Sequence, residues 1–460
     1  MTELPSGWGR AEISDLCNLI NGRAFKPQEW SEFGLPIIRI QNLNNADAKF
    51  NHFSGTFDAK HHVKNGDLLF AWSGTPGTSF GAHIWYGGDA VLNQHIFKIE
   101  FSELEINRGF LRYAINQKLD ELIGSAQGGV GLRHVTKGTF EKTEIVFPPR
   151  AEQTRIAAKL DELLAQVDTL KCRIDGIPAL LKRFRQSVLA AAVSGRLTEE
   201  WRKQTRDTQE VVLQHRKPPL HQIYAEDNFT APPNWLLTAL GNVANFQQGL
   251  QIAKSERRNA PSEDSLPILR TVNYENEFKD DVHYAAISEK SIIAEEKDII
   301  LSRTGTVGRV LTGYRGIMHN NSFRINYESK LLQRDYLIYF LESPLCQEYI
   351  KKKSGKSSQP DLTHKEFSKC PALVPPICEQ KEIVRRVEQL FAFADQLEAK
   401  VASAKKRIDH LTQSILAKAF RGELVPQDPN DEPASVLLQR IKTQRATTPK
   451  AKRGRTKAGA

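Results

Sequence analysis

The chain contains an internal duplication, and this feature constrains its fold more than any other. The segment FPPRAEQTRI, which begins at Phe147, matches VPPICEQKEI, which begins at Val374, at an offset of 227 residues. Further on, SVLAAAVSGRL from Ser187 matches SILAKAFRGEL from Ser414 at the same offset. Two copies of about 230 residues are too few and too long for a solenoid of stacked repeats. The duplication therefore predicts a molecule with pseudo-twofold symmetry.

The segments upstream of these matches correspond more loosely. LPIIRIQN from Leu35 resembles LPILRTVN from Leu266, and DLLFAWSGTPG from Asp67 resembles DIILSRTGTVG from Asp298, now at an offset of 231 residues. The upstream units share only a scaffold, whereas the downstream units keep their sequence. We infer that the downstream units meet the same kind of partner twice and that the upstream units meet different targets.

The downstream units have the apolar spacing of a coiled coil. Apolar residues alternate at intervals of four and three, which defines an a/d seam; the alternative is an ordinary core-facing helix. The seam of the first copy consists of Ile156, Leu160, Leu163, Val167, Leu170, Ile174 and Ile177, and that of the second of Ile383, Val387, Leu390, Ala394, Leu397, Val401, Ala404, Ile408, Leu411 and Ile415. Pro-Pro before each helix prevents its backward extension, and Gly195 and Gly422 offer C-terminal stops. Gly176-Ile177-Pro178 predicts a break or a kink in the first helix.

The upstream units contain short β-like runs separated by Gly, Asn, Ser and Thr, together with one helical stretch each, which favours α+β architecture. We expect two α/β domains separated by long helices that form an antiparallel coiled coil. The predicted boundaries are 1–147 and 231–374 for the α/β domains, 148–201 and 375–424 for the helical regions, 202–230 for a linker and 425–460 for a C-terminal segment.

Loops of the upstream units carry side chains that suit DNA. Arginine can donate hydrogen bonds to guanine O6 and N7, Asn or Gln can form two hydrogen bonds with adenine N6 and N7, and hydroxyl groups can hydrogen-bond to phosphate. For each residue the alternative is a turn-forming surface loop. The candidates are Arg39, Gln41, Asn42, Asn44, Ser73, Thr75, Asn93, Gln94, Arg133 and His134 in the first unit, and Arg270, Asn273, Arg303, Thr304, Thr306, Asn320, Lys356 and Ser357 in the second.

Charge adds little to this prediction for the folded part of the chain. The formal net charge is +10, but the last twenty residues, 441–460, contain seven lysines and arginines and no acid. We expect this tail to be disordered and attracted to polyanions, or simply to aid solubility. The sequence shows no secretion signal and no apolar run long enough to span a membrane, so we expect a cytoplasmic protein.

No catalytic motif is found. The Pro-Pro pairs of FPPR, VPPI and APPN all lack the preceding Asn or Asp and the following aromatic residue of an adenine methyltransferase. Gly355-Lys356-Ser357 has the ending of a phosphate-binding loop, but Ile350 occupies the position of its first glycine. The five cysteines form no C-x-x-C pair, and no HExxH motif is present. We therefore expect no catalytic residues, no metal site and no cofactor bound by this chain.

The order of these features resembles the specificity subunits of type I restriction–modification systems. The resemblance rests on the FPPRAEQ and VPPICEQ junctions, the heptad helices after them, and the SGRLTEEW and RGELVPQDPNDEPASVLLQRI endings. It implies two target-recognition domains, each reading one half of a split site in double-stranded DNA. It also implies that two modification subunits bind the helical regions and methylate adenine with S-adenosylmethionine. Two restriction subunits would use ATP and Mg²⁺ for translocation and cleavage, and no membrane would be involved.

Other functions remain compatible with the sequence. The same module could serve a type IIB-like methyltransferase–nuclease. A stand-alone sequence-specific DNA-binding regulator would bind DNA without such partners and leave it unmethylated. A structural coiled-coil scaffold would form homo-oligomers and show no sequence preference.

Overall fold

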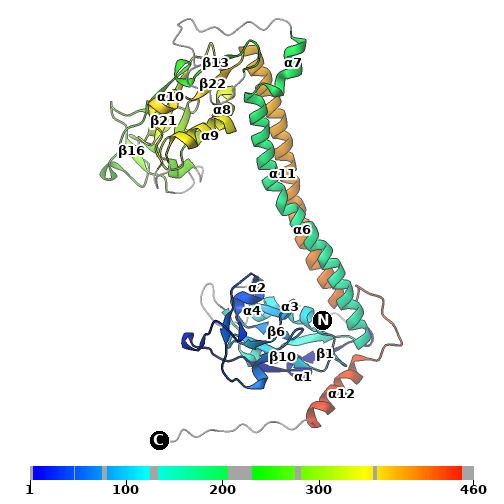
Figure 1. Ribbon diagram of the computed structural model, residues 1–460. Coiled ribbons are helices and arrows are strands. Elements are labelled where there is room, and N and C mark those ends of the chain that lie inside the picture. The colour runs from blue at the N-terminus through cyan, green and yellow to red at the C-terminus, as the bar shows by residue number, and fades with distance from the viewer. Residues whose placement is uncertain are drawn as a thin grey trace, which may run out of the picture. The chain divides into compact units, whose positions relative to one another are not determined.

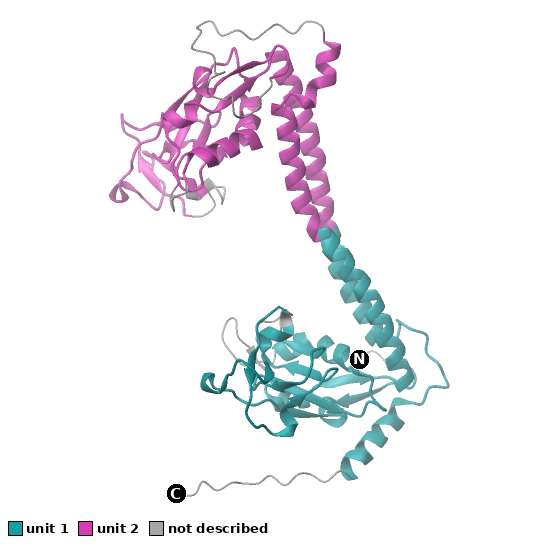
Figure 2. Cartoon of the chain, viewed as in Figure 1, with its two compact units in different colours: residues 1–174, 404–460 teal, residues 175–403 magenta. Residues whose placement is uncertain are grey.

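The computed structural model describes residues 4–45, 47–74, 80–124, 133–205, 231–274, 281–355 and 360–447. The chain divides into two compact units, which Figure 2 distinguishes by colour. Unit 1 comprises residues 1–174 and 404–460, and unit 2 comprises residues 175–403. Each unit combines small sheets with helices, so the α+β class and the repeat of the architecture are confirmed.

Unit 1 is built around two four-stranded sheets. The first has the order β2-β10-β6-β8 and is antiparallel throughout. Its strands are β2 (Cys17–Asn21), β10 (Ile96–Phe101), β6 (Leu68–Ala71) and β8 (Gly81–Ile84). The second has the order β4-β3-β9-β5, with β3 and β9 parallel. Its strands are β4 (Asn51–Phe53), β3 (Leu35–Ile38), β9 (Ala90–Leu92) and β5 (His62–Val63). Two short pairs complete the unit, β1 (Gly9–Glu12) with β12 (Glu144–Phe147) and β7 (Ser73–Gly74) with β11 (Arg133–His134).

Unit 2 repeats the two four-stranded sheets and the β1–β12 type of strand pair, whereas the β7–β11 pair is replaced by an isolated bridge between Thr304 and Asp361. Its first sheet contains β14 (Ala244–Gln248), β21 (Ser322–Tyr327), β18 (Ile299–Ser302) and β19 (Val310–Leu311), in that order. Its second contains β16 (Tyr284–Ala286), β15 (Ser265–Leu269), β20 (Gly316–Met318) and β17 (Ile293–Ala294), with β15 and β20 parallel. The strand pair that closes the unit is β13 (Leu236–Ala239) with β22 (Pro371–Val374).

Strand β6 shows why these runs form buried strands. All four of its residues, LLFA, are buried, and successive side chains of a strand point to opposite faces. Leu68 and Phe70 join the main core of unit 1, whereas Leu69 and Ala71 join a smaller cluster with Ile38 of the second sheet. A strand that is covered on both faces has a continuously apolar sequence, and the sequence of β6 is of this kind.

Short helices cover the sheets, and polar caps begin several of them. Asn107 caps α3 (Arg108–Gln117), and Gln333 caps the corresponding α8 (Arg334–Glu342). Thr136 and Thr363 likewise cap α5 (Lys137–Glu141) and α10 (His364–Ser368). Such side chains bond backbone N–H groups that have no partner within the helix. The remaining short helices are α1 (Ile13–Leu16), α2 (Ile40–Asn44), α4 (Leu119–Gly124), α7 (Glu199–Gln204) and α9 (Pro344–Lys353).

Two helices of equal length, α6 (Arg150–Val193) and α11 (Ile377–Phe420), contain the predicted heptads. Within each unit they run in opposite directions (Figure 1). Lys171 pairs with Asp409 at 3.0 Å in unit 1, and Arg185 pairs with Asp395 at 2.5 Å in unit 2. Both helices begin directly after Pro-Pro and end before a glycine with positive φ, Gly195 or Gly422, as predicted. None of the helices in the described ranges has a stretch long and apolar enough to cross a bilayer.

Most of the predicted seam is buried or partly buried. The buried members are Ile156, Leu160, Val167, Ile383, Val387, Ala394, Ile408 and Ile415. Leu163 and Leu390 are partly buried against the main cores of units 1 and 2. Leu170 and Leu411 depart from the pattern, because they remain 44% and 46% exposed. The heptads therefore identify the packed face but do not predict that parts of it remain open.

The predicted break at Gly176-Ile177-Pro178 is wrong, because α6 is helical throughout this segment. Pro178 is exposed, whereas Ile177 is partly buried and Leu181 is buried. Proline removes one backbone hydrogen bond. Packing of the apolar face outweighs this loss, because most helical stability in proteins comes from tertiary contacts.

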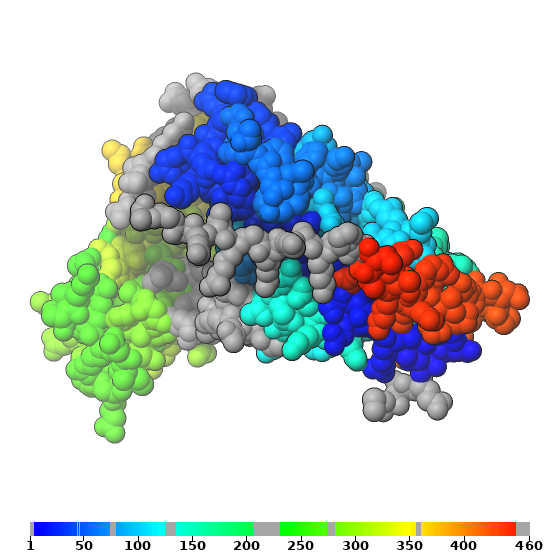
Figure 3. Space-filling view, turned by 90° about the horizontal axis from the view of Figure 1, so that it is seen from below, coloured from blue at the N-terminus to red at the C-terminus, as the bar shows by residue number. Residues whose placement is uncertain are grey.

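The prediction of a disordered tail from residue 441 is also wrong for its first residues. Helix α12 (Ala434–Thr447) includes residues 441–447, and it buries Ala434, Leu437 and Ile441 in the core of unit 1. Arg445 donates to Asn18 Oδ1 at 2.5 Å, and Lys442 lies 3.5 Å from Asp15. Figure 3 shows this helix, in red, against the N-terminal residues, in blue. Residues 448–460 lie outside the described ranges.

Candidate nucleic-acid interface

The duplicated Pro-Pro-x-x-Glu-Gln segments attach each long helix to a sheet domain. The glutamates accept hydrogen bonds from tryptophans that lie 144 residues earlier in the chain. Trp8 Nε1 donates to Glu152 Oε2 at 2.9 Å, and Trp235 Nε1 donates to Glu379 Oε2 at 2.8 Å. All four residues are buried. The motif is therefore a structural joint that holds the candidate DNA-binding loops on the helices.

The glutamine of the motif forms the second half of the joint. Gln153 Oε1 accepts from the backbone N of Asn107 at 2.8 Å, and its Nε2 donates to the Pro148 carbonyl at 3.0 Å. Gln380 makes the equivalent bonds to Gln333 N and the Pro375 carbonyl, both at 2.7 Å. The repeated sequence indicated that these residues are important, but it did not reveal their hydrogen-bond partners, which lie far away in the chain.

The two joints differ in how their carboxylates are satisfied. Glu379 Oε1 accepts from Thr198 Oγ1 at 2.6 Å and also pairs with Arg202. Glu152 Oε1 is buried and has no hydrogen-bond partner among the described residues. Burial raises the pKa of the Glu152 carboxyl, although the Trp8 hydrogen bond acts in the opposite direction. The repeat therefore conserves the tryptophan contact but not the ion pair.

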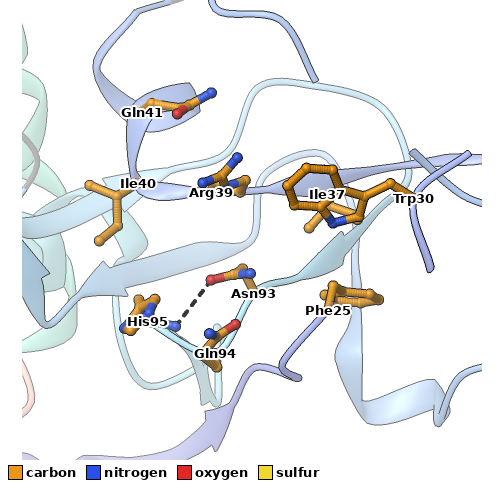
Figure 4. A pocket seen from close by; sticks show the side chains of 9 residues that line it. All are labelled: Phe25, Trp30, Ile37, Arg39, Ile40, Gln41, Asn93, Gln94 and His95. Carbon is orange, nitrogen blue, oxygen red and sulfur yellow. Dashed lines mark hydrogen bonds between the residues drawn. The ribbon is translucent and has the colours of Figure 1, made fainter. Parts of the chain in front are cut away.

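Four predicted DNA-binding residues of unit 1 line one hollow of about 190 Å³. Arg39 and Gln41 come from the start of α2, and Asn93 and Gln94 come from the turn between β9 and β10. Figure 4 shows these two segments on opposite sides of the hollow, with Trp30 and Phe25 at one end. The fold thus brings together candidates that lie more than fifty residues apart in the sequence.

Arg39 is partly exposed in this hollow, and no carboxylate of the described residues neutralises its charge. It is the N-cap residue of α2, and its backbone N donates to Asn42 Oδ1 at 3.1 Å. The guanidinium carbon lies 5.6 Å from the centre of the Trp30 ring. Among the described residues no carboxylate forms an ion pair with Arg39. Trp30, which is 41% exposed, was not predicted as a site residue.

Other candidates of unit 1 have structural roles or lie outside the description. Asn42 is buried, and its Nδ2 donates to the Ala48 carbonyl at 3.2 Å, so its amide stabilises the turn. Asn93 is buried and accepts from His95 N at 3.4 Å, while Ser73 is buried in β7. Thr75 lies outside the described residues. The side chains of Asn44, Arg133 and His134 are likewise not described.

The counterpart of Arg39 in unit 2 is neutralised. Arg270 donates from Nη2 to both Oδ2 and the carbonyl oxygen of Asp281, each at 2.8 Å. Asn273 is buried and donates to the same carbonyl at 3.1 Å. Asn320 lies in the turn after β20, where its carbonyl accepts from Gln248 at 3.0 Å. Arg270 and Asn273 therefore form a hydrogen-bonded network with Asp281, and Asn320 is bonded separately to Gln248.

In the other predicted cluster of unit 2, an aspartate again takes up the donors of the arginine. Arg303 makes two-pronged contacts of 2.7–2.9 Å with Asp361, and Thr304 forms an isolated backbone bridge with the same residue. The Thr306 carbonyl accepts from Ser302 Oγ. Lys356 and Ser357 lie outside the described residues.

A basic pair in unit 2 was not predicted. Arg257 Nη2 lies 3.3 Å from Nε2 of the buried His319, which occupies the same place after its strand as Asn93 in unit 1. Burial, followed by the Arg257 charge, lowers the pKa of His319. No local motif marks this pair, because the two residues are 62 positions apart.

Comparisons with known proteins match the whole chain. A family model described as type I restriction modification DNA specificity domain matches residues 5–179 and again residues 232–404. The EcoBI specificity subunit of Escherichia coli, a type I restriction enzyme component, is 34% identical over 99% of this chain and 96% of its own length. The EcoKI specificity subunit of Escherichia coli strain K12 is 33% identical and covers 99% of both chains.

Solved structures have the same fold. A chain from a structure of a type I R-M system superposes with a TM-score of 0.68 at 18% identity, covering 92% of this chain and 100% of that one. The HsdS subunit from Thermoanaerobacter tengcongensis superposes with a TM-score of 0.57, also at 18% identity, covering 92% and 99%.

Proposed function

Because the chain belongs to the type I restriction modification DNA specificity family, we propose that it binds a split site in double-stranded DNA. It does so as the specificity subunit of a type I restriction–modification complex. Unit 1 contacts one half of the site and unit 2 the other. The chain selects the sequence, and partner subunits methylate or cleave it.

The observation that carries this proposal is the double match of the DNA specificity domain model, once in each copy. The two copies share sheets, joints and helices, yet the side chains around Arg39 and Arg270 differ in their partners. A common scaffold with different polar surfaces suits the recognition of two different half-sites, because base edges are distinguished by donor and acceptor pattern.

We infer that α6 and α11 bind the partner subunits. Four large apolar side chains on these helices stay exposed, namely Leu170, Leu180, Phe393 and Leu411. Exposed apolar surface on a long helix pair favours protein association. Two modification subunits would dock there and supply S-adenosylmethionine-dependent methylation of adenine. Two restriction subunits would supply the steps that require ATP and Mg²⁺. This chain would contribute no catalytic residue.

The test is a map of methylated adenines in the source cells, with the gene present, deleted and restored. We expect the deletion to remove one split motif and the restored gene to return it. A methylome that does not change, in cells whose partner methyltransferase gene is expressed, would contradict the proposal. Capture of the tagged full chain then serves as a second readout, because a specificity subunit must recover a methyltransferase.

A further inference from the structure

We propose that the hollow beside Arg39 reads one G·C base pair in the half-site bound by unit 1, with Arg39 on the guanine. This inference rests on the proposed function and assigns a base to one position of the site. The residues that carry it are Arg39, Trp30 and Gln94, which come from three separate segments of the fold.

The geometry of Arg39 fits the edge of a guanine. A guanidinium presents parallel N–H donors, and guanine is the base that offers two adjacent acceptors, O6 and N7, in the major groove. The Arg39 backbone is fixed at the start of α2 by the hydrogen bond to Asn42. Trp30 lies against the guanidinium at 5.6 Å and limits its conformations without consuming its donors. A restrained arginine with free donors loses little entropy when it binds a base.

Gln94 supplies the complementary group. It lines the same hollow, and its Oε1 is buried without a hydrogen-bond partner among the described residues. Buried polar atoms in folded proteins are nearly always paired, so an unpaired one indicates a missing ligand. The cytosine of a G·C pair presents an N4 amino donor next to guanine O6. Arginine donors on one side and an amide acceptor on the other therefore match this base pair.

The duplicated unit provides an internal comparison. Arg270 occupies the position of Arg39, but Asp281 takes up its donors at 2.8 Å. Arg303, the other predicted arginine of unit 2, donates to both carboxylate oxygens of Asp361 at 2.7 Å. Directly after the short 3-10 helix of unit 2, Arg257 stands where unit 1 has Trp30. Of the three predicted arginines Arg39, Arg270 and Arg303, only Arg39 combines an aromatic neighbour with donors that no described carboxylate takes up, so we assign guanine reading at this position to the unit 1 half-site.

The test replaces single guanines with 7-deazaguanine, which keeps Watson–Crick pairing but lacks the N7 acceptor. The full chain in its methyltransferase complex is titrated with duplexes that carry the split site found by methylome mapping. We expect one guanine in the unit 1 half-site whose replacement weakens binding roughly 5- to 100-fold, the range for loss of a two-pronged base contact. The same replacement should leave binding by the Arg39→Ala complex unchanged, because its contact is already lost.

Two further variants separate this contact from general effects. Arg39→Lys keeps the positive charge but lacks the planar fork, so it should also lose most of the sensitivity to 7-deazaguanine. Arg270→Ala, at the matched position in unit 2, should keep the full sensitivity in the unit 1 half-site. The measurement on the wild-type complex needs no variant, so a variant that fails to fold does not prevent the test.

The outcomes distinguish two failures. If the complex binds no split site, the proposed function fails, and this inference fails with it. If a split site is bound but its unit 1 half contains no guanine sensitive to N7 removal, only the inference is overturned. Equal sensitivity of the wild-type and Arg39→Ala complexes at every guanine would also overturn it.

Discussion

The two joints offer a matched pair of substitutions with unequal expected costs. Glu379→Ala removes a fully buried carboxylate from Trp235, Thr198 and Arg202. Glu152→Ala removes the equivalent carboxylate from Trp8, its hydrogen-bond donor in unit 1. Both changes delete the same atoms from the same motif. The difference between them therefore reports the Arg202 ion pair together with the Thr198 hydrogen bond, which the second joint has and the first lacks.

The magnitude follows from the partners left behind. Arg202 is 14% exposed and Glu379 is 0% exposed, and removing one member of such a buried pair costs about 3–5 kcal/mol. In unit 1 the loss is one buried indole donor, which costs about 1–3 kcal/mol. Part of that cost is offset, because the substitution also removes a carboxylate whose pKa is raised by burial. We expect Glu379→Ala to be worse by roughly 2 kcal/mol.

Hydrogen exchange measured by mass spectrometry can assign each loss to its own unit. Amides of residues 195–204 and 235–240 report on the second joint, and amides of residues 8–12 report on the first. A difference of roughly 2 kcal/mol corresponds to about a 30-fold greater increase in local opening for Glu379→Ala. Glu379→Gln, which keeps an acceptor for Trp235 but loses the charge, should fall between the two. Equal opening at both joints, or a larger effect of Glu152→Ala, would refute the reasoning.

Three further predictions follow from described contacts. Truncation after residue 447, which removes only 448–460, should leave the thermal midpoint unchanged. Removal of 434–460 should lower the stability of unit 1 by about 3–6 kcal/mol, because two large apolar side chains of α12 lose their burial. Equal midpoints of the two truncated chains would argue against packing of α12. Leu163→Asp and Leu390→Asp should each impair folding or assembly by placing a charge in the helix seam, and normal recovery of both in complex would contradict that seam. Because burial raises the pKa of the Glu152 carboxyl, its protonation stabilises the folded state below the usual carboxyl pKa of roughly 4.3. This stabilisation is lost as the pH rises through the raised pKa of Glu152. Wild type should therefore lose stability relative to Glu152→Gln over that rise, as denaturation of unit 1 at several pH values would show.

Local patterns in the sequence were sufficient for the long helices. The heptads, the preceding Pro-Pro and the glycine stops predicted both helices, and the observed bounds agree. Pro178 does not break the helix, because packing of the helix face compensates for the lost backbone bond. The end of α12 was missed for a related reason. Its basic side chains obscure three apolar residues that are buried in the core of unit 1.

The candidate site was predictable only in part. Base-edge chemistry singled out Arg39, Arg270 and Arg303 as equivalent candidates, since sequence alone gives no partners. The structure distinguishes the three arginines by their partners. Arg303, for example, donates hydrogen bonds to Asp361, which lies 58 residues later in the chain. The ring contact of Trp30 with Arg39 was missed because a lone aromatic residue in a loop carries no periodic signal. Contacts set by tertiary folding decide which charges stay available.

The division of the chain into units has a consequence for its synthesis on the ribosome. Unit 2 is one uninterrupted stretch, residues 175–403, whereas unit 1 combines residues 1–174 with residues 404–460. The general rule that N-terminal domains fold first during translation is therefore reversed. The first sheets to emerge lack their contacts with α12 until residues 434–447 are made; in the folded unit Ala434 N donates to the Gly7 carbonyl at 2.8 Å. A nascent chain halted before residue 434 would hold a complete second unit and an incomplete first one. A premature stop before residue 434 would then damage the unit that also contains residues 1–174.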